Sequence, residues 1–156
     1  MSISQQIATT LATEWTLAGT LAVANMHFST GWYDSRYQNH PQVTVSKAWT
    51  PEPRWFGPTA SDGPLTYISW DKYFVDCWLT IDRDILGESE YESVEDMMTE
   101  CFRILNEERL NFTGAAGPLG HVMPLDRGTA MHETNRQPYI LHIQMLAQAN
   151  YRSGTP

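Results

Sequence analysis

The chain has 156 residues, of which 42% are hydrophobic and 18% are charged, and its formal net charge is −8. This size and composition predict a single globular domain over residues 1–156. The sequence has no run of eighteen apolar residues, and its first fifteen residues lack the layout of a secretion signal, so neither a membrane span nor export is expected.

The net charge comes from one segment. Residues 82–108 hold ten acidic residues and two arginines, whereas the remaining eight acids and eight bases cancel. Nucleic-acid binding needs clustered Lys and Arg, so this distribution argues against it. The acidic segment predicts a solvated helix face, or else a surface that repels polyanions or docks a basic partner.

The first expected element is an amphipathic helix capped by Ser2. Ile3, Ile7, Leu11 and Trp15 recur every four residues and form one apolar stripe, and Gly19 ends the pattern. We expect residues 16–34 to be loop, with a short extended piece over residues 23–28.

A strand is expected over residues 42–49, because "PQVTVSKAW" alternates and is rich in β-branched residues. Residues 50–64 follow with four prolines and two glycines, which predicts an irregular loop. Loops of this kind are often interaction elements, and Trp55 and Phe56 would need a partner or a fold-back to leave water.

A hairpin is predicted next, with strands at residues 65–70 and 73–82 joined by a tight turn at Asp71-Lys72. One side of the second strand is expected to face the core: Tyr73, Val75, Cys77, Leu79 and Ile81. The other side is half polar and is expected to face water or another chain: Phe74, Asp76, Trp78, Thr80 and Asp82.

A second helix is expected to begin after Ser93 as its N-cap. Its apolar residues follow helical spacing and should cover a sheet: Val94, Met97, Met98, Cys101, Ile104 and Leu105. Its acidic residues should point away: Glu95, Glu100, Glu107 and Glu108. A glycine-rich break over residues 111–120, a short strand and a turn at Asp126–Gly128 are expected to follow.

The last expected strand, residues 139–152, carries one charge in fourteen residues. At about 3.3 Å per residue it would span roughly 46 Å, much longer than a typical strand of about five or six residues. We expect it to overhang the sheet or to serve two sheets, and pairing with a neighbouring copy would protect it. Together these elements predict an α+β fold, with an antiparallel or mixed sheet of about four to six strands and two main helices packed on one face.

The sequence offers little chemistry. It has none of the common nucleotide-binding, hydrolase or metal-binding motifs, and its five histidines lack ligand spacing, so no cofactor or metal is expected. His132 and Glu133 are expected on an exposed loop, and a hydrolase built on them is the weakest reading. Cys77 and Cys101 are expected to be core thiols.

Aromatic residues in expected loops are more informative. Trp32, Tyr33, Tyr37, Trp55 and Phe56 lie outside periodic elements, and such residues suit protein interfaces. They also suit sugar stacking, so a carbohydrate-binding or adhesion module is the alternative.

The order of elements resembles the tail-terminator and neck proteins of tailed viruses, including the head–tail joining and tail-completion families. The resemblance lies in "IATTLATEW", "FSTGWYD…HPQVTVS", "CWLTID…SVEDMMTECFRIL" and the closing "RQPYILHIQMLAQANYR". Residues 50–64 have no counterpart in that pattern.

The resemblance implies a non-enzymatic virion protein, assembled in the host cytoplasm, that forms a six-fold ring at the tail–neck junction. Its partners would be copies of itself, the tail tube and the head–tail connector, with DNA passing through the lumen without specific binding. The hypothesised interface comprises Trp32, Tyr33, Tyr37, Trp55, Phe56, Trp78, His142, Gln144, Leu146, Gln148 and Tyr151. The hypothesised acidic lumen or docking face comprises Glu88, Glu90, Glu92, Glu95, Glu100, Glu107 and Glu108.

Overall fold

The computed structural model describes residues 2–49, 54–56, 66–81, 87–108, 113–114, 117–133, 135 and 138–153. The two α-helices are α1 (Ile3–Glu14) and α2 (Glu88–Glu107), and three short 3₁₀ turns lie at Gly19–Leu21, Val23–Asn25 and Ser35–Tyr37. The strands are β1 (His27–Thr30), β2 (Gln42–Trp49), β3 (Arg54–Phe56), β4 (Thr66–Ile81), β5 (Thr113–Gly114), β6 (Gly117–Arg127), β7 (Met131–Glu133) and β8 (Tyr139–Ser153).

These strands form one sheet in the order β1-β2-β4-β8-β6-β5, with β3 beside β4 and β7 beside β8. β1 runs parallel to β2, and the other pairs are antiparallel. The sheet is therefore mixed, and the predicted α+β class is confirmed. β1 begins at His27, somewhat later than the extended piece expected at residues 23–28.

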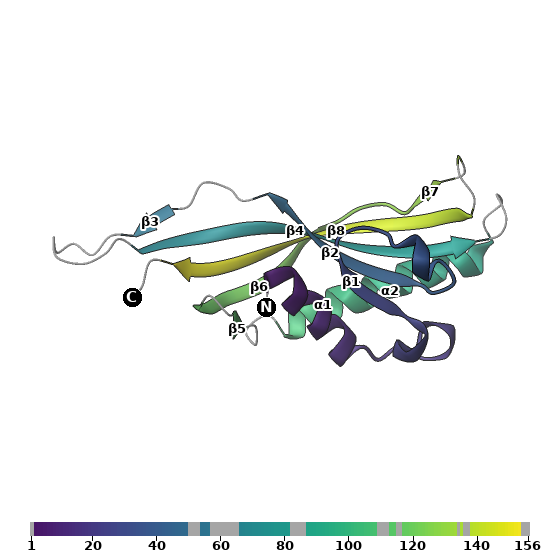
Figure 1. Cartoon of the computed structure of the whole chain (residues 1–156), viewed down its shortest axis with the longest axis horizontal. Helices are drawn as coiled ribbons and strands as arrows, with labels where there is room; N and C mark the ends of the chain where they lie inside the picture. The colour runs from purple at the N-terminus through teal and green to yellow at the C-terminus, as the bar shows by residue number, and fades with distance from the viewer. Residues whose placement is uncertain are drawn as a thin grey trace.

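The two helices pack on one face of this sheet and share its core (Figure 1). α1 begins at the predicted cap, where the Ser2 hydroxyl accepts from the Gln5 backbone and the Gln5 side chain accepts from the Ser2 backbone. Ile7 and Leu11 are fully buried, as the four-residue repeat predicts. Below, "helix face" means the sheet face under α1 and α2, and "open face" means the opposite one. No helix in the described ranges combines the length and apolarity needed to cross a membrane.

The predicted hairpin at residues 65–82 is wrong, because β4 continues without a turn through Asp71 and Lys72. Asp and Lys are poor strand formers, but here the tertiary structure provides partners for both. The Asp71 carboxylate, 2% exposed, lies 3.3 Å from Lys47 Nζ and accepts a hydrogen bond from the Tyr73 hydroxyl. The Lys72 ammonium donates to the Gln148 side chain on β8.

Three other boundaries also differ from expectation. α2 begins six residues before its expected first turn, with Gly87 as N-cap, and the Ser93 hydroxyl donates to the Ser89 carbonyl within the helix. The glycine-rich stretch after α2 contains β5 and the start of β6 rather than a plain break. Arg54–Phe56, in the range expected to be irregular, pairs with β4 as β3. The rest of residues 50–64 lies outside the described residues, as do Asp82 and Asp84.

β8 confirms the predicted long closing strand. The expectation that a neighbouring copy would have to pair with it is not confirmed. β8 pairs with β4 along an unbroken register from Tyr139↔Ile81 to Ser153↔Tyr67. Its other edge pairs with β7 and β6, and the Gly128 N–H donates to the Gln144 carbonyl between them. The neighbours that β8 requires along both edges therefore come from its own chain.

The sheet extends beyond the helices as an arm (Figure 1). We define the arm as β3, Thr66–Trp70 of β4 and Asn150–Ser153 of β8. Among the residues whose burial the structure describes, Tyr73 and Ala149 are the core residues of β4 and β8 nearest to the arm. The chain is therefore elongated, with the arm at one end and the start of α2 at the other (Figure 1).

Candidate assembly surfaces

Part of the open face is covered by the chain itself. Trp78 on β4 is 1% exposed, and its ring stacks on His142 of β8 with centroids 3.7 Å apart. Its indole N–H donates to the Thr44 hydroxyl at 2.9 Å. The Trp32 ring packs edge-on against both stacked rings. The expectation that this side of β4 faces water or another chain is therefore wrong at Trp78.

A buried acid lies beside this stack. Asp76 is fully buried, and its Oδ1 lies 2.5 Å from His142 Nε2 and accepts from Gln144 Nε2 at 2.9 Å. Its Oδ2 is also buried, and none of the described residues forms a hydrogen bond with it. The strand alternation places Asp76 and His142 on lightly polar faces, but only the β4–β8 register brings the two side chains together. Sequence reasoning missed this pair for that reason.

The loop that covers the stack is held at several points. The fully buried Gln42 side chain accepts from the Asp34 N–H and donates to the Asp34 and Tyr37 carbonyls. The Tyr33 hydroxyl lies 3.2 Å from the Thr80 hydroxyl, and the Tyr37 ring stacks on His27. Gly31 has φ of 104°, a conformation that favours glycine, just before Trp32. Contacts within the chain therefore fix Trp32, Tyr33 and Tyr37, although Trp32 remains 56% exposed.

The predicted interface residues thus separate into groups. Trp78 and His142 are buried within the chain, whereas Trp32 and Tyr37 are exposed. Gln144, Leu146 and Gln148 on β8 are half-buried. Leu146 lies on the open face opposite Phe74, and both are half-buried. The backbones of Trp55, Phe56 and Tyr151 belong to the arm, but their side chains lie outside the described part of the structure.

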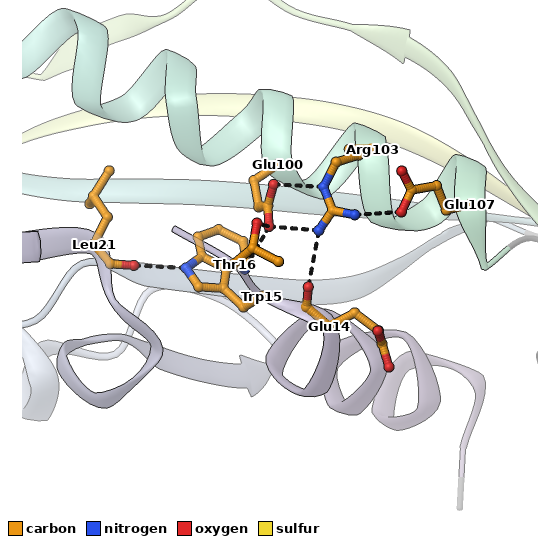
Figure 2. Close-up of polar contacts among 7 residues, drawn as sticks. All are labelled: Glu14, Trp15, Thr16, Leu21, Glu100, Arg103 and Glu107. Atoms are coloured by element: carbon orange, nitrogen blue, oxygen red, sulfur yellow. Dashed lines mark hydrogen bonds and ion pairs between the residues drawn. The ribbon is translucent and has the colours of Figure 1, made fainter. Parts of the chain in front are cut away.

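The acidic residues of α2 also separate. Glu100, expected to point away, is 5% exposed and joins α2 to the end of α1 (Figure 2). Its Oε1 accepts from the Thr16 N–H and hydroxyl, both at 2.7 Å, and Arg103 donates to both its oxygens. Arg103 also donates to the Glu14 carbonyl and to Glu107. Next to this cluster, the buried Trp15 indole donates to the Leu21 carbonyl (Figure 2).

This junction carries a pH prediction. Hydrogen bonds from Arg103 lower the pKa of Glu100 from 4.5 to about 2. Burial acts in the opposite direction and raises this pKa, whereas the hydrogen bonds from Thr16 lower it further. Because the folded pKa lies below the unfolded one, the stabilisation is present above about pH 4.5 and disappears as the pH falls towards about 2. Allowing for screening at the third-exposed Arg103, we expect a loss of about 2 kcal/mol.

Urea unfolding across that pH range would measure this loss. Glu100→Gln should lower the neutral-pH stability by a similar amount and flatten the acid dependence. The control is Glu107→Gln, at a side chain that is 55% exposed and that Arg103 also contacts. An unchanged acid profile in Glu100→Gln would refute the assignment.

The remaining acids of α2 lie on or near its outer surface. Glu95 pairs with Arg127 at the end of β6, whereas Glu88, Glu92 and Asp96 are exposed. They follow one another at four-residue spacing and continue through Thr99 and Phe102, which is 43% exposed. We call Glu88, Glu92, Asp96, Thr99 and Phe102 the outer stripe. Phe102 does not belong to the apolar repeat that packs on the sheet, and this departure from the repeat is visible in the sequence as a sign that Phe102 is exposed.

No cluster of three or more His, Cys, Asp or Glu residues in the described ranges could hold a metal ion. His132 lies half-buried on strand β7 rather than on an exposed loop, so that prediction is wrong. Cys77 and Cys101 are buried core thiols, as predicted, with sulfurs 3.8 Å apart, and burial raises the pKa of Cys77.

Comparison with known proteins finds similarity among solved structures. No protein-family model and no curated protein matches the chain. Among solved structures, a chain from the virion of a native gene transfer agent particle aligns over 97% of this chain and 96% of its own. The identity is 12% and the TM-score is 0.49.

Proposed function

We propose that this chain is a non-enzymatic structural protein of a virion, which forms a ring at the tail–neck junction. In this proposal six copies close the ring, terminate the tail tube and dock to the head connector. The chain would thus act in the tail or neck of the particle. DNA would pass through the lumen without specific binding.

The observation that carries this proposal is the arm. Among the described elements, neither α1 nor α2 extends over the arm, so this part of the sheet backbone has no helix layer on it (Figure 1). Such an element is stable when other subunits cover it, and sheet extensions without cover invite association. The order of the elements, which resembles that of tail-terminator and neck proteins, agrees with an assembly role. The acid-rich α2 would serve the ring as a lumen lining or as a docking face.

Deletion of the gene tests the viral role. We expect heads and tails that fail to join, and tail tubes of unregulated length in electron micrographs, both restored by the wild-type gene. Particles that join and keep their tail length without the chain would contradict the proposal.

Leu146→Lys tests whether the open face is used. It places a charge beside Phe74 where we expect a neighbour, so assembly should be lost while folding is largely kept. Sedimentation velocity would measure the assembly, and circular dichroism the fold. Thr13→Lys, at an exposed position of α1, is the control for added charge. An unchanged oligomer size in Leu146→Lys would count against the proposed surface.

A carbohydrate-binding or adhesion module of a virion is the second candidate. The 56% exposed Trp32 ring is the observation that favours it. Glycan binding that is lost in Trp32→Ala, with assembly intact, would support this alternative.

A further inference from the structure

We propose that a pocket beside the end of β4 binds an uncharged saccharide. This inference goes beyond the ring role and does not depend on it. The pocket has a volume of about 470 Å³, a size that suits a small-molecule ligand. We call it the loop pocket. Its polar lining comprises Thr20, Asn25, Gln38, Asn39, His40 and Thr80, and Pro41 and Leu79 add apolar surface.

The strand register explains where the loop pocket forms. β2 begins at Gln42, which pairs with Trp78, so Leu79–Ile81 of β4 continue past the start of β2. The 3₁₀ turns at Gly19–Leu21 and Val23–Asn25 and the residues just before β2 approach this stretch of β4 and line the pocket with it. The pocket therefore lies where two loops meet a part of β4 that β2 does not cover.

The polar groups of the loop pocket are uncharged. Three carboxamides, two hydroxyls and one imidazole line it, and no Asp, Glu, Lys or Arg belongs to the lining that the structure describes. Carboxamides and hydroxyls both donate and accept hydrogen bonds, as sugar hydroxyls do. A phosphate or carboxylate ligand would call for Lys or Arg, and an apolar ligand for a mainly hydrophobic lining. The lining therefore favours a neutral ligand that carries many hydroxyl groups.

Hydrogen bonds within the chain hold part of this lining in place. The Asn25 carboxamide donates to the Gly19 carbonyl at 3.0 Å. His40 Nδ1 donates to the Asn25 carbonyl, also at 3.0 Å, so the acceptor of the neutral imidazole is Nε2. The Thr80 hydroxyl lies 3.2 Å from the Tyr33 hydroxyl. Groups that are already ordered lose less conformational freedom when a ligand binds.

An aromatic ring lies next to the polar lining. Tyr37 is 40% exposed and stacks on His27, and its ring centroid lies 6.3 Å from that of His40. An exposed aromatic ring offers a rigid apolar surface against which the C–H groups of a sugar ring can pack. Tyr37 would thus hold the apolar side of a saccharide whose hydroxyls bond to the neighbouring carboxamides.

A nuclear magnetic resonance titration of the whole chain tests the loop pocket. The probes are glucose, galactose, mannose and N-acetylglucosamine, with dextran and mannan as chain-bound glycans. We expect a neutral sugar to shift the backbone amide signals of Leu79 and Thr80 and the side-chain amide signals of Asn39. The Kd should be millimolar, because an open site buries little of a small ligand. Tighter binding of a polysaccharide than of its monosaccharide would identify a chain-bound glycan as the source, and equal binding a free sugar.

Variants of the lining locate the binding. Gln38→Ala combined with Asn39→Ala should weaken the affinity about tenfold or more, because a hydrogen bond contributes roughly a factor of five. Both side chains are exposed, so circular dichroism should report an intact fold. Asn106→Ala, at an exposed carboxamide of α2, is the matched control and should bind as the wild type does. If the double variant does not fold, Thr80→Val, which removes only a hydroxyl, replaces it and should weaken binding several-fold.

The inference is overturned if none of these sugars shifts the pocket signals, if the lining variants bind as the wild type does, or if glucose phosphate binds more tightly than glucose. Loss of binding in Trp32→Ala, with binding intact in the double variant, would place the sugar site at Trp32 and contradict the loop pocket. No result here depends on the gene-deletion phenotype or on oligomer size, so the sugar site can fail while the ring role stands, and the reverse.

Discussion

Replacing Trp78 by alanine is expected to lower the free energy of unfolding by about 3–5 kcal/mol, as measured by urea titration. The side chain is 1% exposed, stacks on His142 and donates to Thr44, so its removal leaves a cavity and an unpaired hydroxyl. The loss should occur although no helix covers this face.

Trp32→Ala is the matched control, because that ring is more than half exposed and contacts the same stack from outside. We expect it to cost less than about 1.5 kcal/mol. If Trp78 served mainly a contact between copies, Trp78→Ala would change assembly with almost no change in the stability of the single chain. That result would contradict the burial described above.

Ile104→Ala is expected to destabilise the chain by about 2–5 kcal/mol. Ile104 is fully buried where α2 covers the helix face of the sheet, so its truncation leaves a cavity in the core. Phe102→Ala, two positions away on the outer stripe, should cost less than about 1 kcal/mol. Equal costs at the two positions would mean that α2 presents a different face to the sheet.

Asp76 suggests why strands β4 and β8 keep a single register. A buried carboxylate is costly unless it keeps its polar partners, and among the described residues those of Asp76 are His142 and Gln144, both at Oδ1. A shift of β8 by one residue would move His142 and Gln144 to the helix face and leave Asp76 unpaired. The pair therefore favours the β4–β8 alignment on which the arm depends.

The sequence by itself determined the elements whose patterns are local. The Ser2 cap, the apolar repeats of both helices and the alternation of residues 42–49 and 139–152 predicted α1, the core face of α2, β2 and β8, because capping and periodicity depend on near neighbours along the chain. It also located the acidic segment and the core thiols.

Only the tertiary structure decided the features that depend on partners distant in sequence. From the sequence, Asp71-Lys72 was predicted to form a turn. In the structure both residues continue strand β4, because Lys47 pairs with Asp71 and Gln148 accepts a hydrogen bond from Lys72. From the sequence, Glu100 was predicted to be a solvated acid. In the structure it is buried, because Thr16 and Arg103 donate hydrogen bonds to it. From the sequence, Trp78 was predicted to face water or another chain. In the structure the loop at Trp32 covers it. In each case a polar or amphipathic side chain is placed by its hydrogen-bonding partners, and local sequence does not contain those partners.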